Sequence, residues 1–235
     1  MAMAAAPVKR LLYGVAPSQP VRAVLWLCAY EKLPIELKVT IPPKHTRTPE
    51  FQKLNPRGKI PVLVEDDFAL AEGPAIACYL AESQGWDALY PAGDDRARAR
   101  VNEALSWTAS ELRPASTGVC MSAHRADIVV SDARAAYLRE DLGAKCGVLE
   151  TLLDAHDGYV AAGAVTLADF FAYCELGQLR LGFGENPRTG EVLWDFGAFP
   201  RIERWLDDMA ALPAHDATHA PLLDYAAKLR ADAGR

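Results

Sequence analysis

The sequence predicts an α/β domain over residues 8–89 followed by an all-helical domain over residues 96–235. Strand-like and helix-like patterns alternate up to Leu89, and turn-forming residues then run from Leu89 to Asp95. Beyond that linker, apolar residues recur at three- and four-residue intervals, which is typical of amphipathic helices. With 235 residues, 51% of them hydrophobic, the chain has enough apolar surface for one or two packed cores.

The elements of the first domain follow from short local signals. Pro20 suits the first turn of a helix, and the apolar residues after it recur with helical period. Asp66-Asp67 separates two apolar runs and predicts a hairpin. The predicted order is a strand over 10–15, a helix from Pro20, a strand over 35–41, a short helix over 48–54, hairpin strands over 60–65 and 68–71, and a helix from Pro74.

The second domain is predicted to contain helices alone. Thr166-Leu167-Ala168-Asp169 resembles a capping box, in which side chains at each end bond the free N–H groups of a first helical turn. We assign this phrase a structural role. The predicted helices cover residues 96–112, roughly 131–153, a stretch from Thr166, 200–212 and 222–230.

Composition excludes some classes of function. The net charge of −6 disfavours a nucleic-acid groove that relies on bulk electrostatics. No apolar run is long enough to span a bilayer, and residues 1–10 lack the pattern of a signal or transit peptide. A cytoplasmic location is therefore the expectation.

The cysteines and histidines do not predict a metal site. Five cysteines, an odd number without C-x-x-C spacing, fall in segments that read as helix and are expected to be buried thiols. His215 and His219 have a spacing that would suit metal ligands on a helix. Pro213 and Pro221 bracket them, so we expect a loop there and no metal.

Two phrases in the first domain predict a binding site. Pro61 opens an apolar strand, and because proline cannot donate to a central ladder, it must lie at a strand end, a bulge or a cis bond. Glu72-Gly73-Pro74 begins a helix, where free backbone N–H groups suit an anion. A strand entrance with available backbone and a helix end with a carboxylate are thus expected together.

The chain resembles a soluble glutathione transferase of the theta-like branch over most of its length. The motifs that carry the resemblance are Ser18-Gln19-Pro20-Val21-Arg22-Ala23-Val24, Asn55-Pro56-Arg57-Gly58-Lys59-Ile60-Pro61, Glu72-x-x-Ala75-Ile76, Arg98-x-Arg100-Val101, and Trp107 followed by Arg113. The resemblance implies a thioredoxin-like first domain, glutathione as co-substrate without a metal, and a homodimer that acts in detoxification.

The resemblance also implies roles for individual residues. Ser18 would donate its hydroxyl to the glutathione sulfur, although a serine before such a helix could instead only cap it. Ile60, held by a cis Pro61, would pair its backbone with the cysteinyl part of the peptide. The implied glutathione contacts are Gln19, Lys44, His45, Lys59, Ile60, Pro61, Glu72 and Gly73.

The electrophile pocket would belong to the second domain. Arg113 would face this pocket and stabilise a leaving anion, or would simply end a helix before Pro114. Trp107 could line the pocket, although packing is the preferred interpretation. The electrophile itself stays open among alkyl halides, aryl sulfates, epoxides and peroxides.

The chain departs from the family pattern at two positions. Gly73 stands where a serine is usual, and Ser110 stands where an acid often reaches the partner subunit's glutathione. Loss of one charge-assisted hydrogen bond would weaken binding about 10- to 150-fold. Two hypotheses therefore follow: a conjugating enzyme, or a non-catalytic binding or assembly module with the same fold and a weakened site.

Overall fold

The computed structural model describes residues 8–125 and 127–234, and it confirms an α/β domain followed by a helical domain. Within the described residues no helix is long and apolar enough to cross a membrane. The first domain contains β1 (Arg10–Gly14), α1 (Gln19–Tyr30), β2 (Glu36–Val39), α2 (Pro49–Leu54), β3 (Val62–Glu65), β4 (Phe68–Ala71) and α3 (Gly73–Gln84).

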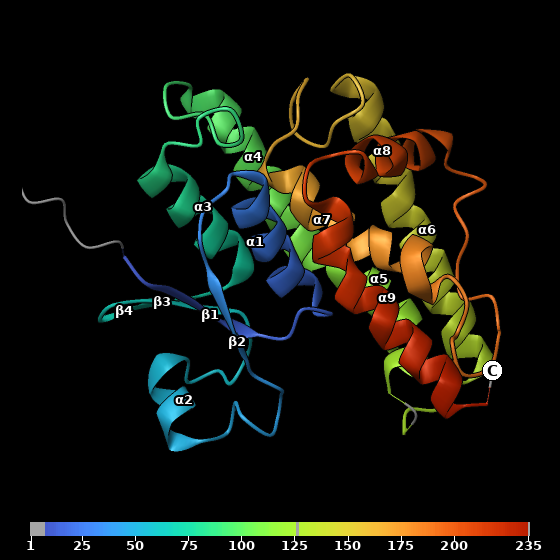
Figure 1. The fold of residues 1–235 in the computed structure, drawn as a ribbon. Helices are drawn as coiled ribbons and strands as arrows, with labels where there is room; N and C mark the ends of the chain where they lie inside the picture. Colours follow the sequence, from blue (N-terminus) through green and yellow to red (C-terminus); the bar gives the residue numbers. More distant parts are fainter. Residues whose placement is uncertain (1–7, 126, 235) are drawn as a thin grey trace, which may run out of the picture.

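The four strands form one mixed sheet in the order β2-β1-β3-β4. Strand β2 pairs parallel to β1, whereas β1–β3 and β3–β4 are antiparallel, with Leu12 opposite both Leu37 and Leu63. Figure 1 shows α2 on one face of the sheet and α1 and α3 on the other. Leu12 and Leu63 are fully buried, and they belong to the same core as the buried residues of α1 and α3.

The second domain packs its helices against α1 and against one another. Its elements are α4 (Asp95–Trp107), the π-helical turn η1 (Thr108–Leu112), α5 (Arg113–His124), α6 (Asp132–Ala155), α7 (Leu167–Gln178), the π-helical turn η2 (Leu179–Phe183), α8 (Pro200–Ala210) and α9 (His215–Asp232). Helix α7 is buried along its whole length and lies against α1, α4, α5 and α8, so it is the centre of this domain.

One interpretation of Arg113 was that it ends a helix before Pro114, but the helical chain that begins with α4 continues past Pro114. Turn η1 connects α4 directly to α5, and the Arg113 N–H donates to the Thr108 carbonyl five residues earlier. Proline has no N–H, and its ring would clash with the carbonyl four residues before it in a regular helix. The wider turn accommodates Pro114, so the chain continues as one bent helical rod.

The prediction of a loop around His215 and His219 was wrong, because both residues lie in the first turns of α9. Pro221 lies inside this helix. A proline at an exposed interior position destabilises a helix by about 3 kcal/mol relative to alanine. Tertiary burial outweighs that cost. The stripe that faces the core consists of His215, His219, Leu222, Ala226 and Leu229.

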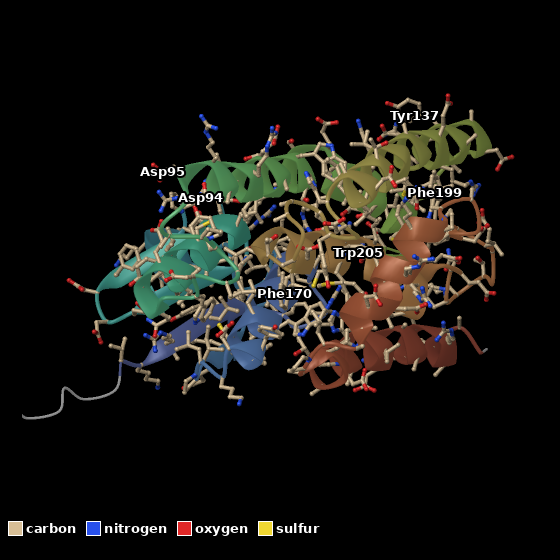
Figure 2. The ribbon with its side chains drawn as sticks, turned by 90° about the horizontal axis from the view of Figure 1, so that it is seen from above. Asp94, Asp95, Tyr137, Phe170, Phe199 and Trp205 are labelled. Atoms are coloured by element: carbon tan, nitrogen blue, oxygen red, sulfur yellow. The ribbon has the colours of Figure 1, made fainter. Side chains whose placement is uncertain are left out.

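The capping box at the start of α7 is confirmed and extends beyond its own helix. Asp169 accepts hydrogen bonds from the Thr166 N–H at 2.8 Å and from the indole of Trp205 on α8 at 3.1 Å. Phe170, the next residue, makes an edge contact with Trp26 of α1. Figure 2 shows Phe170 and Trp205 in the interior, whereas Tyr137 lies at the outer edge of α6.

All five cysteines lie in helices, as predicted, and all are free thiols. Cys78 is half-buried and the others are buried. Burial raises the pKa of Cys28, Cys146 and Cys174 to about 12. These thiols therefore stay protonated at neutral pH and act as small apolar side chains.

Candidate functional site

Ser18 lies between β1 and α1, at the N-cap position of the helix. Its N–H donates to the Val15 carbonyl at 3.0 Å, which closes a tight turn. A Cβ on Gly14 would lie 2.6 Å from Val21, so only glycine lets the strand end approach α1 this closely. The Ser18 hydroxyl makes no cap hydrogen bond to the helix. The capping role proposed as its alternative is therefore not what this hydroxyl does.

The strand entrance is the segment from Asn55 to Pro61 that leads into β3, and the buried side-chain amide of Asn55 shapes it. Asn55, only 2% exposed, donates from Nδ2 to the Lys59 carbonyl at 2.7 Å and accepts from the Arg57 N–H at 3.1 Å. The Ile60–Pro61 peptide bond is cis. Ile60 precedes the paired residues of β3, so sheet pairing does not use its backbone N–H and C=O. An extended peptide could pair with this backbone.

The start of α3 presents a carboxylate beside free helix N–H groups. Glu72, at the N-cap, has a φ of 74°, which is unusual for a residue with a side chain. Its carboxylate lies 3.1 Å from the Arg57 guanidinium, and both side chains are more than half exposed. An exposed pair of this kind contributes little stability, so Glu72 can exchange Arg57 for a ligand ammonium group.

These elements meet helices of the second domain at one cleft of about 220 Å³. The first domain contributes the strand entrance and the start of α3 to the cleft lining. The second domain contributes residues of α4, η1, α5 and α7. Its lining residues are Pro20, Asn55, Lys59, Ile60, Pro61, Glu72, Gly73, Pro74, Leu105, Thr108, Ala109, Arg113, Phe171 and Glu175.

The far wall of the cleft contains an ion pair between a buried carboxylate and a partly exposed guanidinium. Arg113 Nη1 lies 2.5 Å from Glu175 Oε1, and the Ser116 hydroxyl donates to Glu175 Oε2 at 2.9 Å. The Glu175 side chain is 4% exposed and that of Arg113 is 35% exposed. Glu175 therefore holds the guanidinium in place while Arg113 keeps part of its surface open to the cleft. The Thr108 hydroxyl, on the same wall, is buried without a hydrogen-bond partner among the described residues.

The structure brings together six of the predicted residues in the cleft: Lys59, Ile60, Pro61, Glu72, Gly73 and Arg113. Ser18 is half-buried and does not line the cleft itself, but Pro20, two residues later, does. Trp107 packs against the hydrophobic core, in line with the preferred interpretation. Ser110 is exposed and donates to the Ser106 carbonyl within its own helical rod.

Gln19, Lys44 and His45 also lie outside the cleft lining. The Gln19 amide is buried and faces Thr117 of α5 at 3.4 Å. Lys44 is exposed, and His45 Nδ1 accepts from the Ile41 N–H at 3.1 Å. That bond leaves the proton of a neutral His45 ring on Nε2, where it can donate to a ligand carboxylate.

Sequence reasoning missed several residues of the cleft lining, including Phe171 and Glu175. Both come from α7, whose apolar run indicated only a buried helix. A signal was present for Glu175, because a carboxylate within a fully buried helix requires a partner. Phe171 had no such signal. Its place in the cleft depends on how α7 packs against α1 and α3.

The position of Phe171 also explains why residue 73 is a glycine. A Cβ on Gly73 would lie 2.9 Å from Phe171 Cε1 and 3.1 Å from Pro20 Cβ. The glycine is therefore a packing requirement of this site. A serine cannot be introduced there without moving the Phe171 ring.

We expect Gly73→Ser to lower stability by about 1–3 kcal/mol, because the added atoms overpack the cleft. For the same reason, the variant should bind glutathione, the ligand that the family resemblance implies, no better than the wild type does. Thermal denaturation and a glutathione titration measure the two effects. The double variant Gly73→Ser/Phe171→Leu should regain stability. Gly93→Ser is the matched control, since a Cβ there meets nothing within 4 Å. A stable single variant with tighter binding would contradict this account.

Comparison with known proteins identifies the first domain. Residues 12–87 match the family model described as glutathione S-transferase, N-terminal domain. Glutathione S-transferase T2 of Arabidopsis thaliana is 28% identical over 225 residues, which cover 92% of this chain and 37% of that protein. The chain thus spans little more than a third of that relative's length.

A bacterial relative and a solved structure extend the comparison across both domains. Glutathione S-transferase GST-4.5 of Xanthomonas campestris pv. campestris is 30% identical over 154 residues, covering 64% of this chain and 72% of that protein. The structure of human glutathione transferase theta-2, in complex with glutathione and an unknown ligand, superimposes with a TM-score of 0.80 at 28% identity and covers 95% of this chain and 91% of that one. The chain belongs to the glutathione S-transferase family.

Proposed function

We propose that this chain is a serine-type, theta-like glutathione transferase that conjugates the glutathione thiolate to a small electrophile. One observation carries the proposal: a single cleft joins the strand entrance at Ile60 and the helix start at Gly73 to the cationic wall at Arg113. The first two suit an extended peptide with a carboxylate end, and the third suits an electrophile that releases an anion. The solved relative bound to glutathione supports the same ligand.

In this proposal each residue has a defined part. Ile60 pairs with the cysteinyl backbone, Glu72 meets the γ-glutamyl ammonium, and the α3 start meets its carboxylate. Lys59 and, across the entrance, Lys44 or His45 serve the glycyl carboxylate. The Ser18 hydroxyl donates to the sulfur.

The energetics of that last bond are sufficient. A free thiol has a pKa of about 8.5, and a lowering of ~2 units requires roughly 2.7 kcal/mol of preferential stabilisation of the thiolate. A hydrogen bond to a charged group supplies ~1.5–3 kcal/mol, and the adjacent helix start adds up to ~2 kcal/mol. Binding also orients the thiolate toward the electrophile, which is then attacked in an effectively intramolecular step.

Glutathione binding gives a direct test. Glutathione at 100 times its Kd should stabilise the protein by ~2.7 kcal/mol, seen as a raised Tm. S-methylglutathione, whose sulfur is blocked, should also raise the Tm but support no conjugation. A panel of an alkyl halide, an epoxide, an aryl sulfate and a peroxide then identifies the electrophile class. No shift with millimolar glutathione and no turnover with any electrophile would favour the non-catalytic alternative instead.

We further propose a cytoplasmic homodimer with a role in detoxification, and a division into domains at 8–89 and 96–235. The family resemblance supports the dimer and the role. The turn-rich segment between α3 and α4, with a helical domain after it, supports the division. Sedimentation equilibrium measures the mass of the assembly.

A further inference from the structure

Arg22 is a fully buried cation next to the candidate nucleophile-activating residue. It lies on α1, one helical turn after Ser18, and has no exposed surface. Among the ion pairs of the described residues none includes Arg22. Arginine is rarely buried without a carboxylate partner, because loss of water around the charge is costly. Its retention here requires a reason.

The contacts of the guanidinium point to that reason. Arg22 Nη1 donates to the Pro17 carbonyl at 2.8 Å, and Nη2 donates to the Cys174 carbonyl at 2.8 Å. Pro17 immediately precedes Ser18. Cys174 lies on α7 between Phe171 and Glu175, the two residues that this helix contributes to the cleft. The planar Arg22 guanidinium therefore links the turn that contains Ser18 to the part of α7 that forms the far wall of the cleft.

We propose that Arg22 is a positioning residue that holds the Ser18 hydroxyl at the sulfur of bound glutathione. The inference rests on the proposed function. A hydroxyl that stabilises a thiolate must be held within a fraction of an ångström. The bond from the Ser18 N–H to the Val15 carbonyl holds one side of the Pro17–Ser18 peptide, and the Pro17 carbonyl on its other side is held by Arg22. The bond from Arg22 to the Pro17 carbonyl fixes the orientation of that peptide. The bond from Arg22 to the Cys174 carbonyl fixes the position of the peptide relative to the far wall of the cleft.

Trp26 provides a matched control for a merely structural role. It lies on the same helix, is fully buried, and also links α1 to the second domain, through a bond from its indole to the Pro213 carbonyl at 3.0 Å. This hydrogen bond ends at the segment before α9, and the Trp26 ring packs against Phe170 and Tyr173 of α7, neither of which lines the cleft. Weakening it should reduce stability without moving the hydroxyl.

The experiment compares Arg22→Lys, Arg22→Met and Trp26→Phe with the wild type. The pKa of the bound glutathione thiol is measured from the ultraviolet absorbance of its thiolate and from the pH profile of kcat/KM, and the Tm is measured alongside. We expect Arg22→Met to raise that thiol pKa by about 0.5–1 unit and to lower kcat/KM about three- to tenfold at pH 6.5. Arg22→Lys, which can hold one carbonyl, should show a smaller shift. Trp26→Phe should lower the Tm and leave the thiol pKa unchanged.

Three results would overturn the inference. A folded Arg22→Met protein with the wild-type thiol pKa would show that Arg22 does not position Ser18, and so would an equal shift in Trp26→Phe. If neither Arg22 variant folds, the residue is assigned to stability alone and the inference fails. Failure of the proposed function has a different signature, because the wild type itself would then bind no glutathione or Ser18→Ala would leave the thiol pKa unchanged.

Discussion

Replacement of Ser18 with alanine is expected to lower kcat/KM for glutathione conjugation by about 10- to 150-fold. The range corresponds to one hydrogen bond to a charged group, ~1.5–3 kcal/mol. The fold should be unaffected, because the hydroxyl makes no cap bond to α1. The variant is assayed with the electrophile that the panel identifies, and a thermal melt checks that it is folded.

The pH dependence of this variant has a defined sign. Without the hydroxyl the bound thiol should return toward its ordinary pKa near 8.5, so the thiolate fraction falls most at low pH. The loss of activity should therefore be larger at pH 6.5 than at pH 9. Ser83→Ala on α3 is the control, because this hydroxyl donates to the Leu80 carbonyl and accepts from the Gln84 side-chain amide, both on the same helix. Full activity in Ser18→Ala at pH 6.5 would remove Ser18 from the mechanism.

Replacement of Asp169 with alanine is expected to lower the free energy of unfolding by roughly 3–5 kcal/mol. The carboxylate is fully buried and accepts from the Val160 N–H at 3.0 Å, from the Thr166 N–H and hydroxyl at 2.8 and 2.9 Å, and from the Trp205 indole at 3.1 Å. Alanine leaves these donors buried without an acceptor. Since α7 carries Phe171 and Glu175, partial loss of this helix start should also weaken glutathione-dependent activity.

Chemical denaturation measures the change, with the m-value as a check on two-state behaviour. Asp169→Asn should fall between the wild type and the alanine variant, because its amide oxygen can still accept from Val160 and Trp205. Asp208→Ala, an exposed position on α8, is the control for the loss of a charge. A loss below about 1 kcal/mol in Asp169→Ala would mean that water replaces the carboxylate at the start of α7.

Local signals were sufficient for most of the fold. Each strand and helix of the first domain, and the start of α7, follows from turn residues, prolines or a capping box that act within a few residues of one another. The errors in the predicted helices arose at prolines, because proline usually ends a helix locally but tertiary packing kept these helices intact. Burial of the His215–Leu229 stripe keeps Pro221 inside α9, and a π-helical turn carries the chain past Pro114.

The sequence by itself determined the domain order, the strand entrance at Pro61, the helix start at Glu72-Gly73 and the family, because these depend on contiguous motifs. Tertiary structure alone decided what faces them. Phe171 and Glu175 reach the cleft only because α7 packs against α1, and Arg22 links the two domains only across that contact. Gly73 shows the difference most clearly: in the sequence it is a missing hydroxyl, and in the structure it is the space that Phe171 requires. Contacts between distant segments depend on shape and volume, which no local pattern encodes.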